Sequence, residues 1–267
     1  MKKYLSFFKI RFIAGLQYRA SAIGGISTQF FWGIMCILMY SAFYKESKDA
    51  FPMNFHQIVN YVWLQQSLLA MINVYVYDNE IFTSITSGNI AYELCRPYDI
   101  YNMWFTKTMA VRLSKVCLRC TPILIFAILI PNPYGITLPP DILSAIFFLI
   151  SLLLGFIVLI SFSMLLYISV IFTMSDSGIR YLSSSILDFL SGGIIPLPFL
   201  PDKLKNIFNI LPFSSISSTP FLIYSGYISK ESAIPSIIIQ LLWIIVFVLT
   251  GKLLMRKAMI KMCIQGG

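Results

Sequence analysis

Runs of apolar residues, each long enough to cross a hydrocarbon core of about 30 Å, alternate with shorter polar segments along this chain. An α-helix rises about 1.5 Å per residue, so one crossing takes roughly 20 residues. We predict six crossing helices, at residues 20–44, 58–77, 108–130, 142–173, 179–199 and 233–254. The pattern predicts an all-α fold with one transmembrane domain, residues 1–267, and little room for a soluble domain.

The fourth apolar stretch is longer than one perpendicular crossing requires. Its 32 residues would extend about 48 Å as a continuous helix. We expect it to tilt, protrude or bend, with Gly155 and the serines near residues 161–163 as candidate bend positions. Two short re-entrant helices are the alternative.

Composition and charge place the chain in the membrane. Hydrophobic residues make up 58% of the chain and charged residues only 12%, too few for the polar surface of a soluble globule of 267 residues. With the N-terminus inside, the predicted inner segments hold fifteen lysines and arginines and the outer segments five. This asymmetry predicts that both termini are cytoplasmic. It also accounts for the net charge of +9 without a nucleic-acid partner.

The first 19 residues are basic and amphipathic. At helical spacing one face carries the apolar residues Tyr4, Leu5, Phe8, Phe12 and Leu16. No apolar core with a cleavage site is present, so we expect this segment to be retained as a helix lying in the inner membrane interface. A plain charged extension of the first span is the alternative.

The longest polar segment, residues 78–107, separates the first two predicted spans from the last four. Polar and apolar residues alternate in it at helical spacing, with Gly88 and Pro97 as breaks. We expect short helices at the membrane surface that present Glu80, Glu93 and Arg96 to solvent or to a partner. The segment is therefore either a docking element or an ordinary surface connection.

A second irregular region, residues 196–232, follows the fifth predicted span. Pro196, Pro198, Pro201 and Pro212 exclude one uninterrupted helix there. Broken backbone at membrane depth must be buried in protein or line a cavity, so we interpret the region as an external gate.

Motifs for catalysis or metal binding are weak. Cys117 and Cys120 form a CxxC without a second ligand pair, and the single histidine, His56, lacks a nearby carboxylate pair. Gly251 and Lys252 are followed by leucine rather than Ser or Thr, so they do not form a phosphate-binding loop. We predict a non-enzymatic chain without a cofactor of its own.

Asp188 is the acidic residue inside a predicted span, and it lies among serines. A charge at that depth costs a few kcal/mol unless it is paired or hydrated. It either faces a transport pathway or partner subunit, or it is satisfied structurally by neighbouring hydroxyl groups, an arginine or a water.

Taken in order, three features resemble the type-2 permeases of bacterial ATP-binding-cassette exporters. They are the basic N-terminal helix, the sequence ITSGNIAYELCRP at residues 85–97, and PLPFLPDKLKNIFNILPF at residues 196–213, followed by Pro220 and Gly226. The resemblance covers essentially the whole chain. It implies a multi-pass permease of the bacterial plasma membrane that pairs with a second copy or a related permease.

The resemblance also assigns roles to the two irregular regions. Residues 81–97 would carry the coupling helix that meets a separate cytoplasmic ATPase, which would bind ATP and Mg²⁺ itself. The candidate coupling residues are Glu80, Gly88, Glu93, Arg96 and Pro97. The region from Pro196 to Gly226 would form re-entrant outer helices.

Two other function classes remain open. An ion-coupled secondary transporter should show inverted repeats and several polar residues at the membrane midplane, whereas only Asp188 is evident here. A non-catalytic membrane scaffold or immunity protein is the other alternative. The sequence does not identify a substrate.

Overall fold

The structure, a computed structural model, describes residues 2–73 and 75–261 and is all-helical over these ranges. Its α-helices are α1 (Lys2–Leu16), α2 (Arg19–Glu46), α3 (Phe55–Ser67), α4 (Leu69–Ile72), α5 (Asn79–Thr86), α6 (Ile90–Leu94), α7 (Ile100–Leu129), α8 (Ile142–Thr173), α9 (Ser177–Leu190), α10 (Asp202–Ile210), α11 (Ser218–Tyr224) and α12 (Lys230–Lys261). Two 3₁₀ turns, η1 (Lys48–Ala50) and η2 (Leu197–Phe199), complete the described elements.

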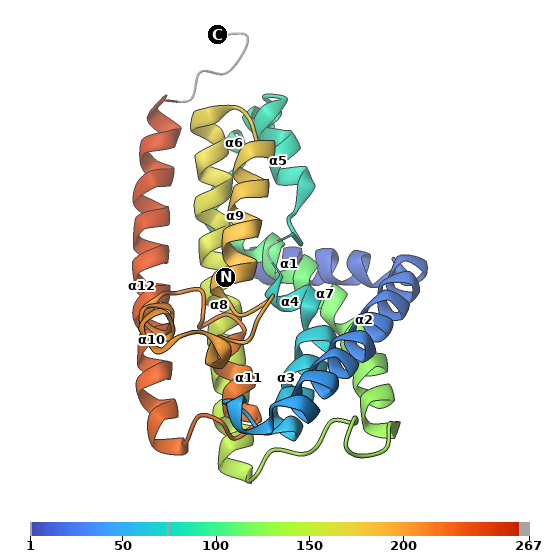
Figure 1. Cartoon of the computed structure of the whole chain (residues 1–267). Coiled ribbons are helices and arrows are strands. Elements are labelled where there is room, and N and C mark those ends of the chain that lie inside the picture. The colour runs from blue at the N-terminus through green and yellow to red at the C-terminus, as the bar shows by residue number, and fades with distance from the viewer. Residues whose placement is uncertain (1, 74, 262–267) are drawn as a thin grey trace.

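Helix α8 is the centre of the fold. It packs along α12 and also contacts α11, α5, α7, α4 and α9. Figure 1 shows α8 and α12 upright and side by side, with α2, α3 and α7 on the other side of the molecule and α1 running across it. Helices α5 and α6 lie at the same end of the molecule as the end of α12.

Among the residues that the structure describes, three helices are long and apolar enough to cross a membrane: Arg19–Glu46, Ile142–Thr173 and Lys230–Ile260. The prediction of six spanning helices is therefore not confirmed. The predicted span at residues 58–77 is broken, because α3 ends at Ser67 and α4 at Ile72. Helix α7 has 30 residues, but Lys107, Arg112, Lys115 and Arg119 lie within it.

The predicted span at residues 179–199 is also shorter than expected. Helix α9 has 14 residues, about 21 Å of rise, and ends at Leu190. Gly192 follows with a φ of +80°, and the backbone N–H groups of Gly193 and Ile194 bind the carbonyl oxygen of Asp188. A glycine in this left-handed conformation closes the last turn of a helix.

The fourth stretch forms one continuous helix, α8, from Ile142 to Thr173, so the alternative of two short re-entrant helices is wrong. Ser161 and Ser163 donate hydrogen bonds to carbonyl groups one turn earlier in the same helix. Gly155 instead lets the backbone at Ser215 and Ile216 pass against α8. Because Gly155 has no side chain, the two backbones can pack closely.

Helix α1 forms as predicted and packs on α7, but its packed face differs slightly. The half-buried residues are Tyr4, Phe7, Phe8, Arg11, Phe12, Gly15 and Leu16. Leu5, predicted on this face, is 71% exposed. The packed stripe follows the spacing of three and four residues typical of a helix face.

We predict that Gly155→Ala lowers the free energy of unfolding by about 1–3 kcal/mol, the usual cost of overpacking. The added Cβ would overlap the carbonyl oxygen of Ser215 and lie 3.0 Å from that of Ile216. The measurement is the apparent melting temperature in detergent, followed by tryptophan fluorescence. Gly24→Ala is the matched control, because nothing lies within 4 Å of its Cβ position and alanine favours a helix. Equal melting temperatures for Gly155→Ala and the parent protein would contradict the packing role.

Candidate functional site

The polar segment 78–107 folds into a short helical hairpin, α5 and α6, that is anchored on α8. Asp78 accepts a hydrogen bond from the backbone N–H of Glu80 at 3.0 Å and so caps α5. Ile81, Phe82 and Ile85 are buried, and α5 packs on α8. Gly88 joins the two helices with a φ of +76°, a backbone conformation that residues with a side chain rarely adopt. The hairpin is thus a fixed element of the fold.

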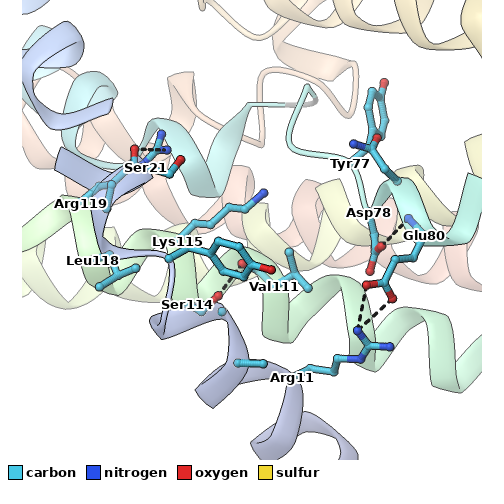
Figure 2. Close-up of a pocket in the computed structure, with 15 residues that line it drawn as sticks. Arg11, Ser21, Tyr77, Asp78, Glu80, Val111, Ser114, Lys115, Leu118 and Arg119 are labelled. Carbon is cyan, nitrogen blue, oxygen red and sulfur yellow. Dashed lines mark hydrogen bonds and ion pairs between the residues drawn. The ribbon is translucent and has the colours of Figure 1, made fainter. Parts of the chain in front are cut away.

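A cluster of ion pairs ties this hairpin to α7 and α1. Lys107 Nζ lies 3.3 Å from Asp78 Oδ2 and 2.8 Å from Glu80 Oε2. Glu80 also pairs with Arg11 Nη1 at 2.9 Å (Figure 2). The hydrogen bond from Lys107 is the main cause that lowers the pKa of Glu80 below its ordinary value. Glu80 therefore joins three elements of this chain.

Two further predicted coupling residues also make contacts within the chain. Trp104 donates its indole N–H to Glu93 Oε2 at 2.7 Å. Lys3 donates to the carbonyl oxygen of Pro97 at 2.8 Å. Arg96 is exposed, as is Tyr92, whose exposed fraction is 73%. The outward surface of the hairpin therefore includes Tyr92 and Arg96, beside the exposed residues of the turn around Gly88.

Tyr92, Arg11 and Lys107 belong to this site but were not predicted from the sequence. A usable signal was the position of Lys107 at the start of a long apolar helix, since a buried lysine requires an acidic partner. Asp78 and Glu80 were available in the preceding polar segment. The pairing of Lys107 with Asp78 and Glu80 depends on the fold, which brings the start of α5 next to α7.

Buried Arg112 supports the break between α4 and the hairpin. It is 0% exposed, and its Nη1 donates to the carbonyl oxygen of Asn73 at 2.7 Å. A second carbonyl oxygen, of Met71, lies 3.5 Å away. These carbonyl groups lie at the C-terminal end of α4, where no further helical turn can bind them. The arginine thus stabilises the end of α4.

The second irregular region packs between α3, α8 and α12. Gln240 of α12 donates to Ser151 on α8 and to the carbonyl oxygen of Ser215 at 2.8 Å. Tyr61 of α3 donates to the carbonyl oxygen of Gly192 at 2.9 Å. Side chains of α12 and α3 therefore satisfy part of the backbone of the predicted gate and of the turn before it, as broken backbone in a membrane protein requires.

Of the four prolines predicted for the gate, Pro196, Pro198 and Pro212 are buried and Pro201 is exposed. Pro198 also lines a cavity of about 210 Å³. The proline-rich segment thus lies mostly inside the fold, beside α12.

Asp188 is half-buried on α9, and within the described residues its carboxylate has no hydrogen-bond or ion-pair partner. Ser183, Ser184 and Ser185 donate instead to carbonyl groups of α9 itself. In the described part of the chain, the hydroxyl groups of these serines therefore do not bind the Asp188 carboxylate, which was one of the alternatives left open by the sequence.

We predict that Lys107→Gln lowers the free energy of unfolding by about 3 kcal/mol, because it leaves the Asp78 carboxylate buried without its cation. Lys107 and Asp78 side chains are only 7% and 6% exposed. Melting in detergent measures the change. Lys205→Gln is the control, since it breaks the exposed Asp202–Lys205 pair and should cost less than about 1 kcal/mol.

A second variant, Asp78→Asn with Lys107→Gln, should regain much of the lost stability, because neither charge is then isolated. Asparagine can still cap α5. Strictly additive losses in this double-mutant cycle would show that the two groups do not interact.

Comparison with known families gives one match. The family model described as ABC-2 family transporter protein matches residues 30–266. No curated protein matches the chain at a significant level.

Proposed function

Because the chain belongs to the ABC-2 family of transporter proteins, we propose that it is the permease subunit of an exporter driven by a separate cytoplasmic ATPase. The ATPase binds ATP and Mg²⁺, and this chain contributes half of the substrate pathway. The observation that carries the proposal is the α5–α6 hairpin. Its inner face is anchored on α8 and α7, whereas Tyr92 and Arg96 remain exposed on its outer face.

The contacts of the hairpin provide a route for a mechanical stroke. Tyr167 of α8 accepts a hydrogen bond from the backbone N–H of Asp78 at 3.0 Å, and its ring lies against Phe82 of α5. Force applied to the hairpin therefore reaches α8 directly. The ion pairs of Lys107 and Glu80 carry the same movement to α7 and α1.

Helix α8 extends this route to the predicted gate. At Gly155 it lies against the backbone of Ser215 and Ile216, and at Ser151 it is bound by Gln240. A shift of α8 would move the re-entrant segment relative to α12. The hairpin and the gate thus share one rigid helix, which is how packed elements transmit a two-state change.

We place both termini and the hairpin on the cytoplasmic side of a bacterial plasma membrane, and the gate on the outer side. The distribution of basic residues supports this orientation. The position of the hairpin at the same end of the molecule as the end of α12 agrees with it (Figure 1).

A second permease copy, or a related permease, completes the pathway in this proposal. Helix α12 has a row of exposed apolar residues along its length: Ile234, Ile238, Leu241, Leu242, Ile245, Leu249 and Leu253. Such a surface must face lipid or another subunit. Asp188 is the charged group that we assign to the pathway or to the partner permease.

We predict that Tyr92→Ala combined with Arg96→Ala lowers the ATP-hydrolysing activity that co-purifies with the tagged chain by about tenfold, since aromatic and arginine side chains dominate binding surfaces. Expression and melting temperature should stay unchanged, because both side chains are exposed. Lys252→Ala with Arg256→Ala, two exposed positions on α12, is the control.

Glu93→Ala should behave differently from the Tyr92 and Arg96 variant, because it removes the bond to Trp104. It should lower the melting temperature as well as ATPase recovery. Normal ATPase recovery with the Tyr92 and Arg96 variant would argue against the hairpin as the docking surface.

We predict that Asp188→Asn and Asp188→Leu both impair transport-coupled ATP hydrolysis while the complex still assembles, because the carboxylate has no partner within the described part of the chain. Asparagine keeps the size and hydrogen-bonding capacity of the side chain but removes its charge. Native gel electrophoresis reports assembly, and phosphate release reports coupling. Full activity of the Asn variant with loss of assembly in the Leu variant would instead indicate a structural hydrogen-bonding role.

A further inference from the structure

A cavity of about 450 Å³ lies where α1 turns into α2, between these helices, α7 and residues 77–80. It is distinct from the outward surface of the coupling hairpin. Arg11, Lys115 and Arg119 contribute basic side chains to its lining, and Asp78 and Glu80 contribute acidic ones. Figure 2 shows Lys115 between Arg119 on one side and Asp78 with Glu80 on the other.

The acidic groups of the cavity are already compensated. Glu80 binds Lys107 and Arg11, and Asp78 binds Lys107. These four groups together are neutral. Lys115 and Arg119 therefore leave two positive charges in the cavity.

Neither of these two cations has an acidic partner within the described residues. Arg119 has one weak contact, from its Nη2 to the carbonyl oxygen of Ser21 at 3.5 Å. No hydrogen bond or ion pair engages the Lys115 amine in that part of the chain, and no dashed line reaches it in Figure 2. A half-buried lysine beside an arginine is costly without a counter-ion.

The position of the cavity specifies the source of that counter-ion. Helix α2 is one of the three membrane-crossing candidates and begins at Arg19, directly after the turn that follows α1. Ile10 and Ile13 on α1 and Ile23 on α2 are exposed, although they do not line the cavity. Exposed apolar side chains on the helices that border a basic cavity suit lipid acyl chains that lie beside a bound phosphate headgroup.

We propose that this cavity binds the phosphate headgroup of an anionic phospholipid from the cytoplasmic leaflet. Lys115 and Arg119 bind the phosphate oxygens, since both cations present N–H donors to such groups. The apolar residues of α1 and α2 lie along the acyl chains. The bound lipid would fix the angle between α1 and α2 and thereby the position of Arg11 beside Glu80. The choice of leaflet rests on the orientation proposed above, but lipid binding itself does not require the ATPase.

The test is native mass spectrometry of the purified chain in detergent, titrated with phosphatidylglycerol or with phosphatidylcholine of the same acyl chains. The parent protein should retain phosphatidylglycerol preferentially. Lys115→Gln with Arg119→Gln should weaken its binding about 30-fold, which corresponds to about 1 kcal/mol for each basic residue.

Three variants separate the headgroup site from general charge and from misfolding. Lys115→Arg keeps the charge and should bind within about threefold of the parent. Ser21→Trp keeps both cations but fills the cavity that Ser21 lines, and should weaken binding at least tenfold. Lys45→Gln with Lys48→Gln removes two exposed charges near the other end of α2 and should change nothing.

Equal retention of the two lipids by the parent protein, or unchanged phosphatidylglycerol binding in the double Gln variant, would overturn the proposal. A competition experiment with inorganic phosphate distinguishes a lipid site from a site for a free anion. Displacement of the lipid by millimolar inorganic phosphate would identify a free-anion site and would also overturn it. Because no ATPase is present in this assay, its outcome is independent of the proposed coupling function.

Discussion

Backbone that leaves a helix inside a membrane protein must find hydrogen-bond partners in side chains, and this requirement governs the structure after α4 and after α9. Arg112 binds carbonyl groups where α4 ends. Gln240 and Tyr61 do the same for the segment after α9. Side chains of α7, α12 and α3 therefore hold these two segments in place.

Helix α8 is the central element of the fold because it contacts both irregular regions. It meets the hairpin through Tyr167 and the second irregular region at Gly155, and Gln240 of α12 links its Ser151 to the carbonyl oxygen of Ser215. Because α8 is unbroken, the two ends cannot move independently without bending a 32-residue helix. The continuity of α8 therefore supports the proposed coupling between the hairpin and the second irregular region.

The acidic residues of the hairpin face solvent only in part. Glu80 is exposed, as the sequence predicted, and also joins an ion-pair cluster, whereas the half-buried Glu93 accepts a hydrogen bond from an indole N–H. The exposed side chains of the hairpin also include an aromatic residue, Tyr92. Lys115 and Arg119, by contrast, have no acidic partner within the residues that the structure describes.

The sequence by itself determined the all-helical membrane class, the positions of the two irregular regions and the helix at the N-terminus. These features depend on local properties: hydropathy over about 20 residues, prolines that cannot continue a helix, and periodic apolar residues. It also placed α8 to the residue, because the apolar run at residues 142–173 is uninterrupted.

Only the tertiary structure decided which apolar stretches form long helices and which polar groups meet. The stretches at residues 58–77 and 179–199 are apolar enough to be predicted as spans, yet the helices within them end early. Arg112 binds carbonyl groups at the end of α4, and the glycine turn at Gly192 does the same at the end of α9. The sequence offers Gly155 as a candidate position for a bend. In the fold Gly155 is a packing position, because the backbone of Ser215 lies against it. The pairing of Asp78 with Lys107 and the cavity beside Lys115 likewise depend on residues far apart in sequence, so no local pattern contains them.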